Sequence, residues 1–233
     1  MIDYSKFESF EKIIGLEFKN KKLLVNAFVH RSFLNENAKL GIPHNERLEF
    51  LGDAVLELVI TDYLYKKYPN NSEGELTAYR SALVNAVTLS ETAKEIKINE
   101  YMLLSRGESK DTGKARQYIL ANAFEAVIGA IYLDQGYSGA EKFISSTLYD
   151  KIDEVVSKKL WQDPKSLVQE KAQEVYGVTP SYEVVSESGP DHDKKFIIGI
   201  FFGKEKIAEG KGKSKQEAET ASAKRAVEIK NWN

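Results

Sequence analysis

The stretch HNERLEFLGDAVLEL, residues 44–58, decides the fold class of the larger part of the chain. Its apolar residues recur at intervals of three and four, the period of one helical face. Its acids follow the same period, at spacings of three, four and four: Glu46, Glu49, Asp53 and Glu57. At about 100° per residue these acids occupy one narrow sector, opposite leucines and valines. The stretch therefore predicts a helix, over residues 47–68, with an acidic stripe along one side.

Helical periodicity continues on both sides of this stretch, and strand alternation is almost absent before residue 160. Further helices are predicted over residues 21–30, 75–96, 115–136 and 138–160. The pattern then changes. Strands are predicted at 181–187, 195–202 and 205–212, between helices at 165–176 and 214–230. We expect an all-α domain over residues 1–159, followed by a small α+β domain of order α-β-β-β-α over residues 160–233.

The composition of the chain excludes several kinds of functional site. The chain has 233 residues, 42% of them hydrophobic, which is enough for two domains. Zero cysteines exclude disulfides, thiolate zinc sites and cysteine nucleophiles. The formal charge of −2 gives no bulk indication of a polyanionic partner.

No apolar run approaches the roughly 20 residues of a membrane span, and the start lacks the layout of a signal peptide. We expect a cytoplasmic protein with no membrane association.

Two interpretations of the acidic stripe remain open from the residues alone. The commoner one is a solvated helix face. Like charges one turn apart cost a few tenths of a kcal/mol each, however, and only Arg47 neighbours the stripe to offset them. A missing counter-charge favours a bound cation. Oxygen ligands without cysteine or suitably spaced histidine indicate Mg²⁺, Mn²⁺ or Ca²⁺.

A second set of oxygens lies in the predicted helix 115–136. Asn122 and Glu125 are three residues apart and therefore share a face. Two oxygen-bearing helices that face each other fit a metal site better than chance surface charge does. Glu73, in NNSEGELT, is read more simply as an acid in the first turn of a helix.

The sequence resembles the ribonuclease III family at this point. NERLEFLGDAVL (45–56) resembles its signature, and HRS (30–32), SEG (72–74), FEAVIGAIYLD (124–134) and the α-β-β-β-α tail agree. The resemblance covers essentially the whole chain. It implies a Mg²⁺-dependent endonuclease, with Mn²⁺ as a possible substitute, that works as a homodimer through its catalytic domain. It also implies hydrolysis of double-stranded RNA to 5′-phosphate products with short 3′ overhangs, in ribosomal and messenger RNA processing.

The resemblance also assigns residues. Glu49, Asp53 and Glu125 match the family's metal-binding carboxylates, and Glu46 and Glu73 match further acids of its cleavage valley. Asn122 departs from the pattern, because the family usually has Asp there. An Asn carbonyl can ligate Mg²⁺ but brings no charge, so metal affinity or water activation should weaken. The substitution is either natural or introduced to slow cleavage. His30 and His44 are expected to be structural.

The tail resembles a double-stranded RNA-binding domain. In GKGKSKQEAE (210–219), lysines surround a serine placed to cap the last helix, where free N–H groups can hold phosphate. The resemblance assigns minor-groove contacts to Gln169 and His192. It assigns phosphate contacts to Lys213, Ser214 and Lys215, with Lys211 as a possible supplement because Gln216 stands where the family often has a second lysine. A nucleotide-binding loop is rejected, because Ile207 occupies the position of its first glycine.

Two other functions stay open. Asn122 favours a double-stranded RNA-binding protein that has nearly lost cleavage and acts by occupancy. A helical protein-interaction domain with an RNA-binding tail is also conceivable, but it leaves the acidic stripe unexplained.

Overall fold

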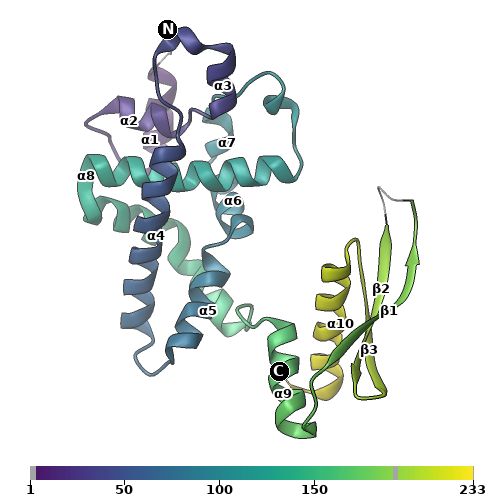
Figure 1. Ribbon diagram of the computed structural model, residues 1–233. Coiled ribbons are helices and arrows are strands. Elements are labelled where there is room, and N and C mark those ends of the chain that lie inside the picture. Colours follow the sequence, from purple (N-terminus) through teal and green to yellow (C-terminus); the bar gives the residue numbers. More distant parts are fainter. Residues whose placement is uncertain (1–3, 191–193, 233) are drawn as a thin grey trace. The chain divides into compact units, whose positions relative to one another are not determined.

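A computed structural model describes residues 4–190 and 194–232. The chain divides into two compact units, one ending at Trp161 and the other beginning at Gln162. The first is helical, and the second is a three-stranded sheet with two helices (Figure 1). The fold class predicted from the sequence is confirmed. Within the described residues, none of the helices has the length and apolar character needed to cross a membrane.

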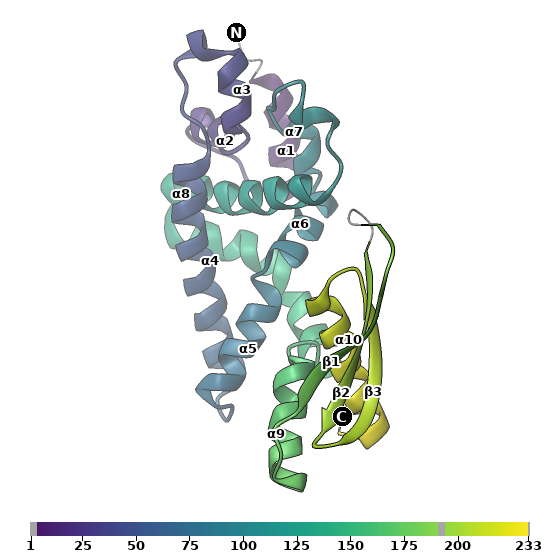
Figure 2. The same ribbon diagram turned by 45° about the vertical axis from the view of Figure 1, so that its right-hand side comes forward.

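Two long helices, α4 and α8, organise the first unit. The helices have these bounds: α1 Ser5–Ile14, α2 Lys21–Ala27, α3 Arg31–Glu36, α4 Glu46–Lys67, α5 Glu73–Leu83, α6 Ala86–Glu95, α7 Ile98–Tyr101 and α8 Lys114–Ser157. Two short 3₁₀ turns, η1 Ala38–Leu40 and η2 Glu108–Lys110, connect them. The first half of α8 crosses α4, and the other helices surround this pair (Figures 1 and 2). The apolar sides of both helices are buried in one core, which includes Leu56, Ile60, Phe124 and Ile128.

The structure corrects one predicted helix, adds one that was not predicted, and joins two that were predicted separately. The predicted helix 75–96 is two helices, because Asn85 has an extended backbone (φ −138°, ψ 159°) and its side chain accepts hydrogen bonds from the Val87 and Thr88 amides. The helices predicted at 115–136 and 138–160 follow one another in α8, with a kink at Gly136 (φ 73°). Helix α1 was not predicted. Its Phe7 and Phe10 side chains are buried and form its inner face.

Glycines set the separation of α4 and α8. A Cβ atom on Gly52 would lie 1.8 Å from the Glu125 carbonyl oxygen, and one on Gly129 would lie 2.2 Å from the Leu48 carbonyl oxygen. Real side chains do not approach so closely, so the two backbones touch only because both positions are glycine. This contact fixes which faces of the two helices meet.

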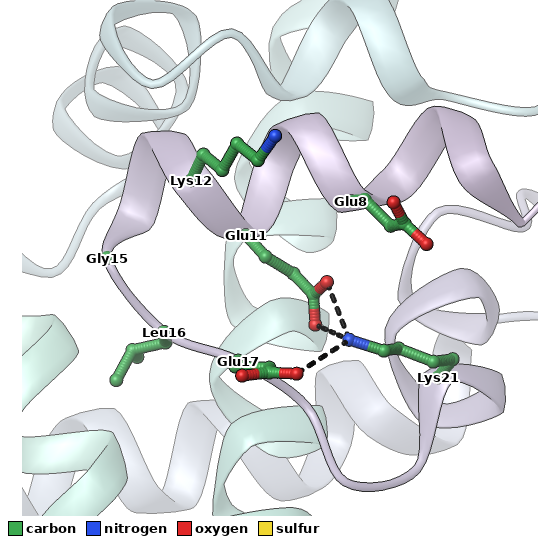
Figure 3. Close-up of a pocket in the computed structure, with 7 residues that line it drawn as sticks. All are labelled: Glu8, Glu11, Lys12, Gly15, Leu16, Glu17 and Lys21. Carbon is green, nitrogen blue, oxygen red and sulfur yellow. Dashed lines mark hydrogen bonds and ion pairs between the residues drawn. The ribbon is translucent and has the colours of Figure 1, made fainter.

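A pocket of about 590 Å³ lies between α1 and the start of α2 (Figure 3). Three of its charged side chains interact: Glu11, Glu17 and Lys21. The buried Glu11 carboxylate accepts hydrogen bonds from Lys21 Nζ at 2.7 and 2.8 Å and from the Phe18 amide at 2.7 Å. Glu17 Oε1 lies 3.9 Å from the same ammonium. The partly buried ion pair and the bond to the Phe18 amide thus hold the loop between α1 and α2 in place.

The second unit has the predicted α-β-β-β-α order. Helix α9 (Pro164–Tyr176) precedes strands β1 (Ser181–Ser188), β2 (Lys195–Phe202) and β3 (Glu205–Gly212), and α10 (Lys215–Lys230) follows them. The strands pair antiparallel in the order β1-β2-β3. A Cβ atom on Gly210 would lie 2.1 Å from the Ser222 amide nitrogen, so β3 and α10 also meet backbone to backbone. Val168, Ile200 and Val227 lie in the small core that results.

Candidate metal centre and nucleic-acid interface

The crossing of α4 and α8 brings four predicted site residues together. Gly52, which touches the Glu125 backbone, lies between Glu49 and Asp53 on α4. On α8, the Asn122 side chain hydrogen bonds to Glu49, and Glu125 lies within electrostatic reach of Glu49 and Asp53. Asp53 is exposed and the other three are partly buried. The facing oxygen sets expected from the two helices are therefore adjacent.

The centre has more negative charge than its surroundings stabilise. Burial and, to a smaller extent, the charges of Asp53, Glu49 and Glu57 together raise the pKa of Glu125 to about 8. Burial also raises the pKa of Glu49, assisted by the charge of Glu46 and opposed by the hydrogen bond from Asn122. Carboxyl groups whose pKa is raised in this way bind a proton or a cation more readily than ordinary surface acids.

The expectation that only Arg47 offsets the stripe was wrong. Arg80, on α5, places its Nε atom 2.7 Å from Glu57 Oε2. Arg31, on α3, places its Nη1 atom 3.6 Å from Glu46 Oε1. Sequence spacing could not show these pairs, because each joins two different helices. Both compensated acids stand at the ends of the stripe, and the middle acids face α8.

The donor chemistry of the centre fits a hard divalent cation. Three carboxylates and the Asn122 amide supply only oxygen ligands of the type that Mg²⁺ and Mn²⁺ prefer. Among residues 4–190 and 194–232, however, no group of three or more His, Asp or Glu side chains is gathered closely enough to hold a metal ion. The backbones are in place, and the carboxylates would have to turn toward a common point to form a full ligand set.

The remaining acids and histidines occupy other positions. Glu46 begins α4, is exposed, and lies 3.7 Å from His44 Nδ1. Glu73 begins α5, is exposed, and is not among the charges that raise the pKa of Glu49 or Glu125. His30 caps α3 and its Nδ1 lies 2.8 Å from Ser32 Oγ. Burial lowers the pKa of His30, which fits the structural role expected of it.

The lysine-rich turn of the second unit surrounds the start of α10. Ser214 caps the helix by accepting a hydrogen bond from the Glu217 amide at 3.1 Å. Glu217 in turn accepts a hydrogen bond from the Lys213 amide at 2.7 Å, so this N–H group is not free for phosphate, which the sequence did not reveal. The side chains expected to contact RNA are exposed: Gln169, Lys211, Lys213, Ser214 and Lys215. His192 lies outside the described residues.

Together the fold and the two surfaces define a class of protein. It has a helical domain with an oxygen-rich centre at a glycine-mediated helix crossing, and a sheet-and-helix domain with exposed lysines at a helix start. Comparison with known proteins agrees with this division. Residues 20–152 match the family described as Ribonuclease-III-like, and residues 164–230 match the Double-stranded RNA binding motif.

Curated relatives extend the match to the full chain. The Ribonuclease 3 of Borreliella burgdorferi is 45% identical over 223 residues, which are 96% of this chain and 91% of that protein. The Ribonuclease 3 of Carboxydothermus hydrogenoformans is 44% identical over 228 residues, 98% and 97% of the two chains. The nuclease domain of ribonuclease III from Campylobacter jejuni superimposes with a TM-score of 0.56 and 38% identity, covering 62% of this chain and 94% of that one. The chain belongs to the ribonuclease III family.

Proposed function

We propose that the protein hydrolyses double-stranded RNA with the help of Mg²⁺, or Mn²⁺ in its place, at the crossing of α4 and α8. Membership of the family, together with the double-stranded RNA-binding motif, supports the coarse activity, a double-strand-specific endoribonuclease. The products we propose are 5′-phosphate fragments with short 3′ overhangs, made from ribosomal and messenger RNA precursors in the cytoplasm. One observation supports the metal centre. The backbones of α4 and α8 touch at Gly52, and as a result Glu49 and Asp53 lie next to Asn122 and Glu125.

The side chains of the centre have separable tasks. A divalent ion bound there would lower the pKa of an attacking water and stabilise charge at phosphorus. Glu49 and Asp53 lie one turn apart on α4, and the charges of both act on Glu125 of α8. Glu125 carries a proton near neutral pH when no cation is close, because its pKa is raised to about 8. The Asn122 amide donates to Glu49 and so limits the orientations of that carboxylate.

The exposed apolar face of α4 supports the proposed homodimer. The Phe50 side chain is 82% exposed and Leu58 is 57% exposed, and these two residues lie on one face of α4 with Ala54 between them. Such a row of apolar residues is a typical contact surface. A second copy of the chain is the occupant we propose, because each chain has one centre and staggered cutting of two strands needs two. The C. jejuni nuclease domain is described as having a region involved in dimer formation.

The second unit is proposed to hold the duplex. Domains of this type read the A-form shape over about 16 base pairs, with minor-groove contacts on either side of a phosphate contact. The exposed lysines and Ser214 at the start of α10 suit phosphate, and Gln169 and His192 are proposed for the minor grooves. Sequence preference should be slight, because contacts to sugar and phosphate carry little base information.

Asn122 supports a second candidate, a protein that binds double-stranded RNA and cuts it poorly. One experiment separates the two. A long, end-labelled RNA duplex is incubated with the protein and Mg²⁺, beside an Asp53→Asn variant, and the products are resolved on a sequencing gel. Short fragments with 5′-phosphates, absent for the variant, support the nuclease. Intact RNA that is retarded on a native gel supports binding alone.

A further inference from the structure

Arg80 ties α5 to the acidic stripe through two contacts. Its Nε atom lies 2.7 Å from Glu57 Oε2, and its Nη1 atom donates to Thr61 Oγ1 at 2.8 Å. The Thr61 hydroxyl donates in turn to the Glu57 carbonyl oxygen at 2.6 Å. Arg80 and Glu57 are only 32% and 38% exposed, so the pair is held by its surroundings as well as by its charges.

Glu57 belongs to the same stripe as the acids of the proposed metal centre. It follows Asp53 by four residues and therefore lies one helical turn further along that face of α4. Its charge also reaches Glu125 across the helix crossing. An unpaired Glu57 would thus be a fourth carboxylate beside the centre, with oxygens free to bind a cation at the wrong place.

We propose that Arg80 is a positioning residue, which holds the Glu57 carboxylate outside the metal ligand set and cancels its charge. The inference rests on the proposed metal centre. A guanidinium suits this task, because it stays charged at every working pH and its planar fork fixes a carboxylate in one orientation. Three carboxylates and the Asn122 amide then remain as donors, with a defined negative charge.

The inference predicts that replacement of Arg80 and replacement of Glu57 change the Mg²⁺ affinity in opposite directions. Arg80→Gln removes a positive charge and frees Glu57, so Mg²⁺ should bind more tightly, on the order of tenfold. Glu57→Gln leaves Arg80 unpaired beside the centre, so Mg²⁺ should bind more weakly by a similar factor. The double variant restores the net charge and should bind Mg²⁺ with the affinity of the unmodified protein. Arg80→Lys should fall between the unmodified protein and Arg80→Gln.

The test is a Mg²⁺ titration of the full chain, followed by the shift in melting temperature, for all of these variants. Lys151→Gln is the matched control, because Lys151 pairs with Glu95 on α6, where no site residue is assigned. Cleavage of a long RNA duplex is measured in parallel. For Arg80→Gln, kcat should fall while KM for RNA stays unchanged, because the misplaced carboxylate perturbs the centre and not the RNA contact.

Several outcomes would overturn the inference. Equal Mg²⁺ affinity in the unmodified protein and both single variants would show that Arg80 acts only through packing. Unchanged Mg²⁺ affinity with a raised KM would assign Arg80 to RNA contact instead. If Arg80→Gln does not fold, Glu57→Gln decides alone, since unaltered Mg²⁺ affinity in that variant contradicts the inference. Absence of any Mg²⁺ response in the unmodified protein would instead remove the proposed metal centre itself.

Discussion

Replacement of Glu125 by Gln should stabilise the metal-free protein at alkaline pH. The folded state holds a proton on Glu125 up to a pKa of about 8, whereas the ordinary value is 4.5. The folded state therefore binds this proton more tightly than the unfolded state does. The contribution of this proton to the free energy of unfolding is fully present at acidic pH. It is lost as the pH rises from about 4.5 toward 8. Gln keeps the shape of the side chain and never acquires the charge.

The magnitude follows from the shift. At about 1.4 kcal/mol for each pKa unit, the full shift would correspond to roughly 5 kcal/mol above pH 8. Partial solvent access screens the charges, so we discount this ceiling to about 1–2 kcal/mol. The stability advantage of Glu125→Gln over the unmodified protein should therefore be about 1–2 kcal/mol larger at pH 8.5 than at pH 5.5.

Urea unfolding in EDTA at these two pH values measures the difference. Asp150→Asn is the matched control, because Asp150 is an exposed acid on the same helix and its replacement should give no comparable pH dependence. Added Mg²⁺ should then stabilise the unmodified protein at pH 8.5 and stabilise Glu125→Gln less. An advantage of Glu125→Gln that is the same at both pH values, or larger at pH 5.5, would refute the reasoning.

Three further predictions follow from the same helix pair. Asn122→Asp adds a charged ligand next to Glu49 and should lower the Mg²⁺ concentration for half-maximal cleavage; an unchanged or higher requirement would contradict this. Phe50→Asp places a charge on the exposed apolar face of α4 and should weaken self-association at least about hundredfold, as measured by sedimentation; an unchanged dimer constant would exclude this face as the interface. Gly52→Ala should cost about 3 kcal/mol or more, because its Cβ would meet the Glu125 carbonyl, whereas the control Gly74→Ala meets nothing within 4 Å and should change the melting temperature little.

Site residues could be predicted from the sequence where they repeat at helical spacing within one helix. The acidic stripe of α4 and the Asn122 and Glu125 face of α8 could be predicted because helical spacing places residues on faces without knowledge of the fold. The lysines at the start of α10 were found for a similar reason, since capping is a local event.

Contacts between elements could not be predicted in this way. Arg80 reaches Glu57 from another helix, and no spacing in the sequence connects them. The break at Asn85 was missed because its neighbours continue the apolar helical pattern, and only the side-chain cap on α6 shows where one helix ends and another begins. The crossing at Gly52 and Gly129 gave a signal, two glycines inside helical patterns, but their pairing required the structure.

The glycine crossing also determines how this centre can vary. Where two helices are separated by side chains, a larger or smaller residue can adjust their spacing in small steps. Here main-chain atoms of the two helices meet directly, so side-chain size cannot adjust the distance between them. A Cβ atom at Gly52 or Gly129 would clash with the backbone of the other helix. Changes in the proposed metal centre must therefore come from its side chains, as at position 122, while the backbone frame that carries them stays constant.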